Sequence, residues 1–152
     1  MFLCCFSDSE RATGLGIAFC GSNVRVTSVV LHADVSEPAD VEKCLLRLGA
    51  SGIPALGKSI GLMFACMGRG RYFYNGAVGV ESAVFKKLYP RVPLFGFFGN
   101  GEIGYDFPPM DGSGCRMDDS SSGGAACDAA DTDVPQMYHS FTTIFVLLSF
   151  GQ

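Results

Sequence analysis

Twelve consecutive residues, 93–104, constrain the fold of this chain more than any other stretch. They contain four glycines, three phenylalanines and a single carboxylate, that of Glu102. Asn100-Gly101 within them is a strong β-hairpin signal, because both central residues of a type I′ turn need positive φ. We therefore expect a strand over residues 94–98, apolar enough to be buried, and a strand that pairs back over residues 103–107.

A helix is predicted over residues 37–48 by the spacing of its apolar side chains. Ser36 is a suitable N-cap, and Gly49 is placed to end the helix. The positions i, i+3, i+4 and i+7 form one apolar face, made of Val41, Cys44, Leu45 and Leu48.

The other apolar runs predict one more helix and several strands. The second helix, residues 80–89, would bury the side that carries Val80, Val84 and Leu88. Residues 1–14 show no clear pattern. The predicted strands are a hairpin at 15–20 and 24–35, a central strand buried on both faces at 60–67, and a last strand at 138–150. The expected class is α+β, a mainly antiparallel sheet of about six or seven strands with two packed helices.

Residues 107–136 differ in composition from the rest of the chain. They hold six Asp and one Arg, a net charge of −5, so the other residues carry about +1 of the total of −4. Paired prolines, a serine run and paired glycines accompany these acids. We expect an acidic, low-complexity, disordered insert that divides one domain into residues 10–106 and 137–151.

Several classes of function lack support in the composition. No basic stripe is present, so we expect no nucleic-acid partner. The seven cysteines include no C-x-x-C pair, and His32 and His139 are the only histidines, so we expect reduced thiols and neither a metal nor a cofactor. The apolar run 141–150 is too short to cross a bilayer as a helix. We therefore expect a cytoplasmic and/or nuclear protein without a membrane partner.

Four pieces of the sequence, taken in order and spacing, resemble the C-terminal FIST domain. The pieces are Phe64-Ala65-Cys66-Met67-Gly68-Arg69-Gly70, the run from Val80 into Pro93-Leu94-Phe95-Gly96-Phe97-Phe98, Gly99-Asn100-Gly101-Glu102-Ile103-Gly104, and His139-Ser140-Phe141-Thr142-Thr143-Ile144. The resemblance runs from about residue 10 to residue 151 and is interrupted by the acidic segment.

This resemblance implies one of two roles. In F-box proteins, the FIST part recruits protein substrates to an SCF-type ubiquitin ligase for ubiquitination and proteasomal degradation. FIST domains are also thought to be sensory modules that bind small metabolites in intracellular signal transduction. The chain shows no F-box, so we expect a fragment that reaches the ligase subunits only through a missing part. An erroneous gene prediction, with wrong boundaries at Met1 and near Phe107, or a product that does not fold, is an alternative.

Cys66 is the first candidate site residue. It closes an apolar run and precedes a glycine-rich turn that carries Arg69 and Arg71. Nearby guanidinium groups favour a thiolate, which would make this cysteine reactive. The alternative is a buried, inert cysteine of the core.

Glu102 and Arg69 form a second candidate site. A carboxylate and a guanidinium, each in a glycine-rich turn, can together hold a zwitterion such as an amino acid. His139 could complete such a pocket from the last strand. The alternatives are a structural ion pair, a solvated turn residue at Glu102, and a structural histidine.

The third candidate is a protein-binding patch at Tyr72-Phe73-Tyr74, beside Arg69 and Arg71. Tyrosine and arginine are frequent hot-spot residues, although the same residues suit a half-buried strand end.

Cys66 and His139 have the residue types of a nucleophile and a base. No orienting acid is recognisable, so we expect no enzyme activity.

Overall fold

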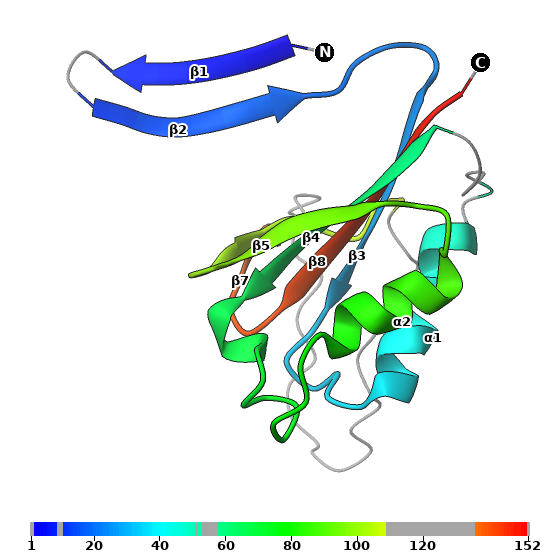
Figure 1. Ribbon diagram of the computed structural model, residues 1–152. Coiled ribbons are helices and arrows are strands. Elements are labelled where there is room, and N and C mark those ends of the chain that lie inside the picture. Colours follow the sequence, from blue (N-terminus) through cyan, green and yellow to red (C-terminus); the bar gives the residue numbers. More distant parts are fainter. Residues whose placement is uncertain (1, 9–10, 51, 53–57, 109–135, 152) are drawn as a thin grey trace, which may run out of the picture.

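A computed structural model describes residues 2–8, 11–50, 52, 58–108 and 136–151, with side chains described from residue 17 onward. Its centre is a four-stranded mixed sheet in the order β3-β8-β4-β5. The bounds of these strands are Val24–Leu31 for β3, Thr143–Phe150 for β8, Ser59–Cys66 for β4 and Leu94–Gly99 for β5. Both helices, α1 (Pro38–Ala50) and α2 (Val80–Leu88), cover one face of this sheet (Figure 1).

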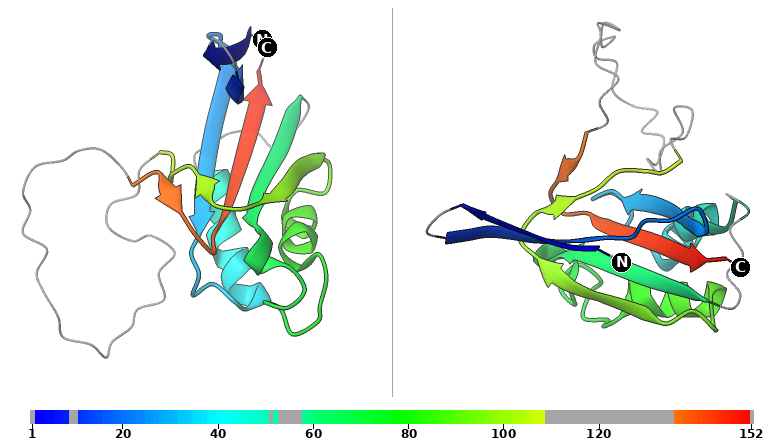
Figure 2. Two further views of the ribbon diagram at one scale, coloured as in Figure 1. Left: turned by 90° about the vertical axis from the view of Figure 1, so that its left-hand side faces the viewer. Right: turned by 90° about the horizontal axis from the view of Figure 1, so that it is seen from above.

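Two smaller strand pairs flank the central sheet. β1 (Phe2–Asp8) and β2 (Arg11–Ala18) form an antiparallel hairpin that projects beyond the end of the sheet (Figures 1 and 2). β6 (Glu102–Ile103) pairs with β7 (Tyr138–His139). Among the described residues the α+β class is therefore confirmed, with more strands than expected. Of the strand pairs in the described part of the chain, only β4–β5 is parallel.

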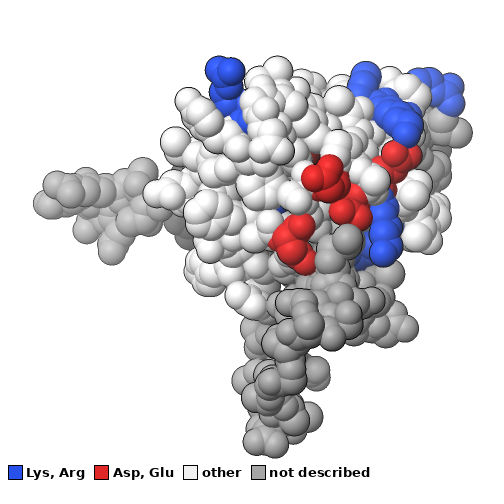
Figure 3. Space-filling model, turned by 90° about the horizontal axis from the view of Figure 1, so that it is seen from below, with Lys and Arg blue, Asp and Glu red and all other residues white. Residues whose placement is uncertain are grey.

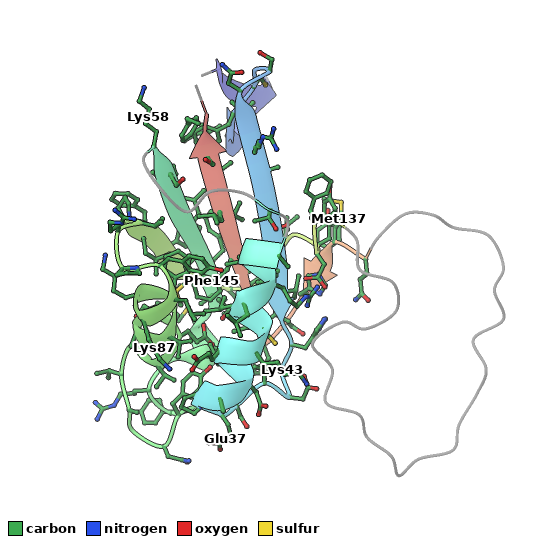
Figure 4. All side chains as sticks on the ribbon, turned by 90° about the vertical axis from the view of Figure 1, so that its right-hand side faces the viewer. Glu37, Lys43, Lys58, Lys87, Met137 and Phe145 are labelled. Carbon is green, nitrogen blue, oxygen red and sulfur yellow. The ribbon has the colours of Figure 1, made fainter. Side chains whose placement is uncertain are left out.

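The core lies between the sheet and the two helices. Val41, Cys44, Leu45 and Leu48 are the buried residues of α1, as the helical spacing predicted. Phe145 on β8 is fully buried and stacks on Phe85 of α2 with ring centroids 5.7 Å apart. Its side chain lies between the sheet and the helices in Figure 4.

Both helices differ in detail from the prediction. Helix α1 runs through Gly49 to Ala50, so Gly49 does not end it. Helix α2 buries Glu81, Val84 and Phe85. Val80 and Leu88, expected on its buried side, are only half-buried, whereas Glu81 is buried with Arg69 and Tyr74 as its hydrogen-bond partners.

The predicted hairpin at Asn100-Gly101 is wrong. Gly101 has φ +89°, but Asn100 is not among the described residues with positive φ, so the pair does not form a type I′ turn. β5 pairs in parallel with β4, and β6 pairs with β7 instead of returning to β5. Phe107, within the predicted return strand, instead forms an isolated antiparallel β-bridge with Ser28 of β3.

Three other strand predictions need correction. Residues 15–20 and 24–35 do not form a hairpin, because β2 pairs with β1 and β3 pairs with β8. Residues 1–14, expected to be unpatterned, contain β1 and the start of β2. The predicted last strand, 138–150, is divided into β7 and β8, and β8 lies in the middle of the sheet. β4 is central, as predicted, but only four of its eight residues are buried.

Most of the predicted acidic insert, residues 109–135, lies outside the described residues. Cys20 and Cys66 are free thiols, as expected, whereas Cys44 is disulfide-bonded. No helix among the described residues is long and apolar enough to cross a membrane.

Candidate functional site

Arg69 is the most constrained polar residue near the glycine-rich turns. It ends the short 3₁₀ helix η1 (Met67–Arg69) that follows β4, and it is 2% exposed. Its Nε donates to Glu81 Oε1 at 2.8 Å, and its Nη2 donates to the Tyr74 hydroxyl at 3.0 Å. The guanidinium also lies over the ring of Phe73, 4.4 Å from its centroid. Side chains of the turn that follows Arg69 and of helix α2 therefore fix its guanidinium in place.

The remaining donors of Arg69 bind backbone carbonyls. Nη1 donates to the oxygens of His32 and Phe141 at 2.9 and 3.2 Å, and Nη2 donates to that of Val35 at 2.8 Å. Five hydrogen bonds thus occupy the five N–H donors of the guanidinium. No donor of Arg69 is left for a ligand.

Tyr74 completes this buried network. Its hydroxyl donates to Glu81 Oε1 at 2.5 Å while accepting from Arg69. Burial, followed by the negative charge of Glu81, raises the pKa of Tyr74 well above its usual value of 10. The hydroxyl is therefore neutral and donating across the physiological pH range.

Glu102 lies on β6 and is 4% exposed. Its Oε2 accepts from the backbone N–H and the hydroxyl of Thr142, at 3.3 and 2.9 Å. Its Oε1 is buried and has no hydrogen-bond partner in the described part of the chain. The expected pairing with Arg69 is not formed, because Arg69 pairs with Glu81. The two side chains instead hold adjacent residues of one segment, since Arg69 binds Phe141 and Glu102 binds Thr142.

His139 lies opposite Glu102 in the β6–β7 pair. Its Nε2 is 2.9 Å from the carbonyl oxygen of Gly104, and its ring contacts that of His32 with centroids 5.9 Å apart. The register therefore places His139 opposite Glu102, and their common ligand pocket stays a prediction. The described hydrogen bonds do not connect His139 with Cys66. No cluster of three or more metal-binding side chains occurs among the residues described.

Cys66 is 8% exposed at the end of β4, and its backbone N–H donates to Thr142 at 2.9 Å. Because all donors of Arg69 bind oxygen atoms, that guanidinium does not supply a hydrogen bond to the thiol. A reactive thiol at Cys66 stays a prediction.

The two tyrosines of the predicted protein-binding patch occupy different environments. Tyr72 is 91% exposed, and the guanidinium carbon of Arg71 lies 5.9 Å from its ring centroid. Tyr74 is buried in the Arg69 network and is not part of an exposed patch. Both belong to a turn, so the strand-end alternative does not apply.

A groove lies beside this network, between β5, the loop before α2 and the first turn of that helix. Its volume is about 610 Å³. The residues that line it include Arg69, Tyr74 and Glu81 of the network, and the remainder are mainly apolar, among them Met63, Met67, Val78, Phe95 and Phe98. Cys66, Tyr72, Glu102 and His139 are not among its lining residues. Four of the predicted site residues therefore lie elsewhere.

Sequence reasoning missed Glu81 and the exposure of β5. Glu81 looked like an ordinary acidic residue in the first turn of a helix, and nothing in the sequence connects it with Arg69. On β5, Phe95, Phe97 and Phe98 are 59%, 64% and 55% exposed, although this run was expected to be a buried strand.

Charge on the surface is mixed. On the face seen from below in Figure 3, acidic side chains lie next to basic ones and most of the remaining surface is uncharged.

Comparison with known proteins agrees with the four sequence pieces. The family model described as the FIST C domain matches residues 12–105. The chain is 38% identical, over 144 residues, to F-box only protein 22 of Homo sapiens and of Pongo abelii. The match covers 95% of this chain and 33% of each relative, so the chain spans about one third of the length of these relatives. This chain belongs to the FIST C domain family.

Proposed function

We propose that this domain recruits protein substrates to an SCF-type ubiquitin ligase, which then ubiquitinates them for degradation. The name of its relatives, F-box only protein 22, supports the connection with an F-box. An F-box would dock the ligase, and the FIST C domain would hold the substrate. The domain itself acts by binding and not by catalysis.

The observation that carries this proposal is the aromatic edge of the sheet. β5 pairs only with β4 among the described strands, and it exposes Phe95, Phe97 and Phe98. Exposed aromatic side chains on adjacent positions are unusual in a monomeric protein and are typical of binding surfaces. An unpaired strand edge also offers backbone hydrogen bonds to an extended segment of a partner.

Affinity capture from proteasome-inhibited cells tests this surface. Phe95→Asp places a charge on the exposed edge of β5 and should reduce capture of specific partners at least tenfold. Ile103→Asp is the matched control, because Ile103 is a similarly exposed apolar residue (62%) on β6. Equal capture by the wild type and by Phe95→Asp would reject the edge as the recruiting surface.

A second role, the binding of an amino-acid-like metabolite, is favoured by one observation. Glu102 Oε1 is buried without a partner, and His139 lies opposite on β7. This oxygen is suited to accept from an ammonium group, although a ligand carboxylate would need a cation other than Arg69. Calorimetry with the amino acids on wild type and Glu102→Gln tests this role. Absence of saturable heat in the wild type would exclude it.

A further inference from the structure

The groove beside β5 has the dimensions and lining of a small-molecule site. Its volume of about 610 Å³ falls within the range that is typical of ligand pockets. Its lining includes Phe95 and Phe98 of β5, Val78 of the loop before α2 and Val80 at the start of that helix. An apolar ligand would displace water from these side chains.

One polar atom at this groove lacks a partner. Glu81 lines the groove, is 2% exposed, and uses Oε1 to accept from both Arg69 and Tyr74. Its Oε2 is buried without a hydrogen bond in the described part of the chain. Buried acceptors are nearly always satisfied in folded proteins. A donor that enters the groove could supply the missing hydrogen bond.

The positive charges near Glu81 favour an uncharged hydrogen-bond donor over a cationic one. The guanidinium of Arg69, 2.8 Å from the same carboxylate, already neutralises Glu81. Arg71 also lines the groove, so a cationic ligand would meet a second positive charge. An uncharged O–H or N–H avoids this repulsion and still completes the hydrogen bonds of Glu81.

We propose that the groove between β5 and the start of α2 binds an uncharged, aromatic or aliphatic small molecule that donates one hydrogen bond to Oε2 of Glu81. This site lies apart from Glu102 and His139, and its ligand differs in charge from an amino acid. The groove shares Phe95 and Phe98 with the proposed recruiting edge of β5, but its test measures probe binding and does not depend on substrate recruitment.

Two probes that differ in one donor test the proposal. The first is p-cresol, whose hydroxyl can donate, and the second is 4-methylanisole, whose methoxy oxygen cannot. Both are titrated into the ¹⁵N-labelled full chain at pH 7 and followed by amide chemical shifts. We expect saturable shifts at residues 77–82 and 94–98, with p-cresol bound about tenfold more tightly. Equal affinity for the two probes, or no saturable shift at these residues, would overturn the proposal.

Two variants extend the test. Glu81→Gln keeps the shape of the side chain but can turn an amide N–H toward the groove, so the preference for p-cresol should disappear. Val78→Trp should fill the groove and weaken both probes, because Val78 is 77% exposed and lines it. Leu46→Trp, at an exposed site on α1, is the control and should bind both probes as the wild type does. Unchanged binding by folded Val78→Trp would place the probes elsewhere and contradict the proposal.

Discussion

Gly96 shows how a single missing side chain permits the parallel pairing of β4 and β5. A Cβ at this position would lie 1.8 Å from the backbone oxygen of Met63, its partner on β4. Such an approach cannot be relieved by a side-chain rotation, since the obstacle is backbone. The glycine-rich sequence of β5 is therefore partly explained by strand packing and not by ligand binding.

We predict that Gly96→Ala lowers the free energy of unfolding by about 3 kcal/mol, because β4 and β5 must separate locally. Urea unfolding measures this change. Gly99→Ala is the control on the same strand. Its new methyl group would lie 3.4 Å from the ring of Phe97 and 3.7 Å from the backbone oxygen of Gly101, so we expect a loss below about 1 kcal/mol. Equal losses in the two variants would contradict this explanation of Gly96.

The buried ion pair between Arg69 and Glu81 should contribute more to stability than an exposed ion pair does. Replacing it by Met leaves Glu81 as an uncompensated buried charge, so Arg69→Met should destabilise the domain by about 3–5 kcal/mol. Lys87→Met removes the exposed partner of Glu42, 2.7 Å away, and should cost less than about 1 kcal/mol. Thermal unfolding of both variants makes the comparison. A small effect at Arg69 would show that its network is not a structural support.

At the scale of elements, Tyr74 connects the turn after η1 to helix α2, and this connection is sensitive to alkali. Folding raises the pKa of Tyr74, so the unfolded chain loses its proton first as the pH rises. The stability due to this group is present below pH 10 and is lost as the pH rises above 10. The pKa of Tyr89 is also raised by burial.

We predict that the free energy of unfolding falls between pH 10 and pH 11, by up to about 1.4 kcal/mol for each of these tyrosines. Tyr74→Phe should have a shallower dependence on pH, whereas Tyr72→Phe, at an exposed site, should match the wild type. Denaturant unfolding at several pH values gives the slopes. An identical slope for Tyr74→Phe would show that Tyr74 does not cause the loss.

The central place of β8 gives a prediction about local stability. β8 is paired on both sides, with β3 and with β4, whereas β5 is paired only with β4 among the described strands. Opening β8 requires the sheet to separate, so its amides should exchange at least tenfold more slowly than those of β5. Hydrogen exchange followed by mass spectrometry checks this order. Faster exchange in β8 would contradict the strand order described here.

Local patterns in the sequence predicted the elements better than their pairing. The apolar face of α1 follows from helical periodicity, which is a property of neighbouring residues. Strand pairing depends on contacts between distant residues, so residues 94–98 were recognised as a strand but assigned a wrong partner. At the site, the Arg69–Glu81 pair was missed for the same reason, since a loop and a helix bring the two together.

At the scale of the whole molecule, a buried network and core lie beside an exposed aromatic strand. The Arg69 network and the core fix the turns around β5, and β5 presents its aromatic side chains to solvent. The chain spans about one third of the length of its relatives, and the proposed docking to a ligase would depend on an F-box. The central claim is that binding at β5 leads to degradation of the bound protein.

The most direct test of this claim is the half-life of the captured partners. The protein that contains this chain is depleted from cells and restored as wild type, Phe95→Asp or Ile103→Asp, and partner decay is followed after protein synthesis is blocked. The account predicts that depletion lengthens the half-lives and that wild type and Ile103→Asp, but not Phe95→Asp, shorten them again. Half-lives that do not respond to depletion would contradict the recruiting role.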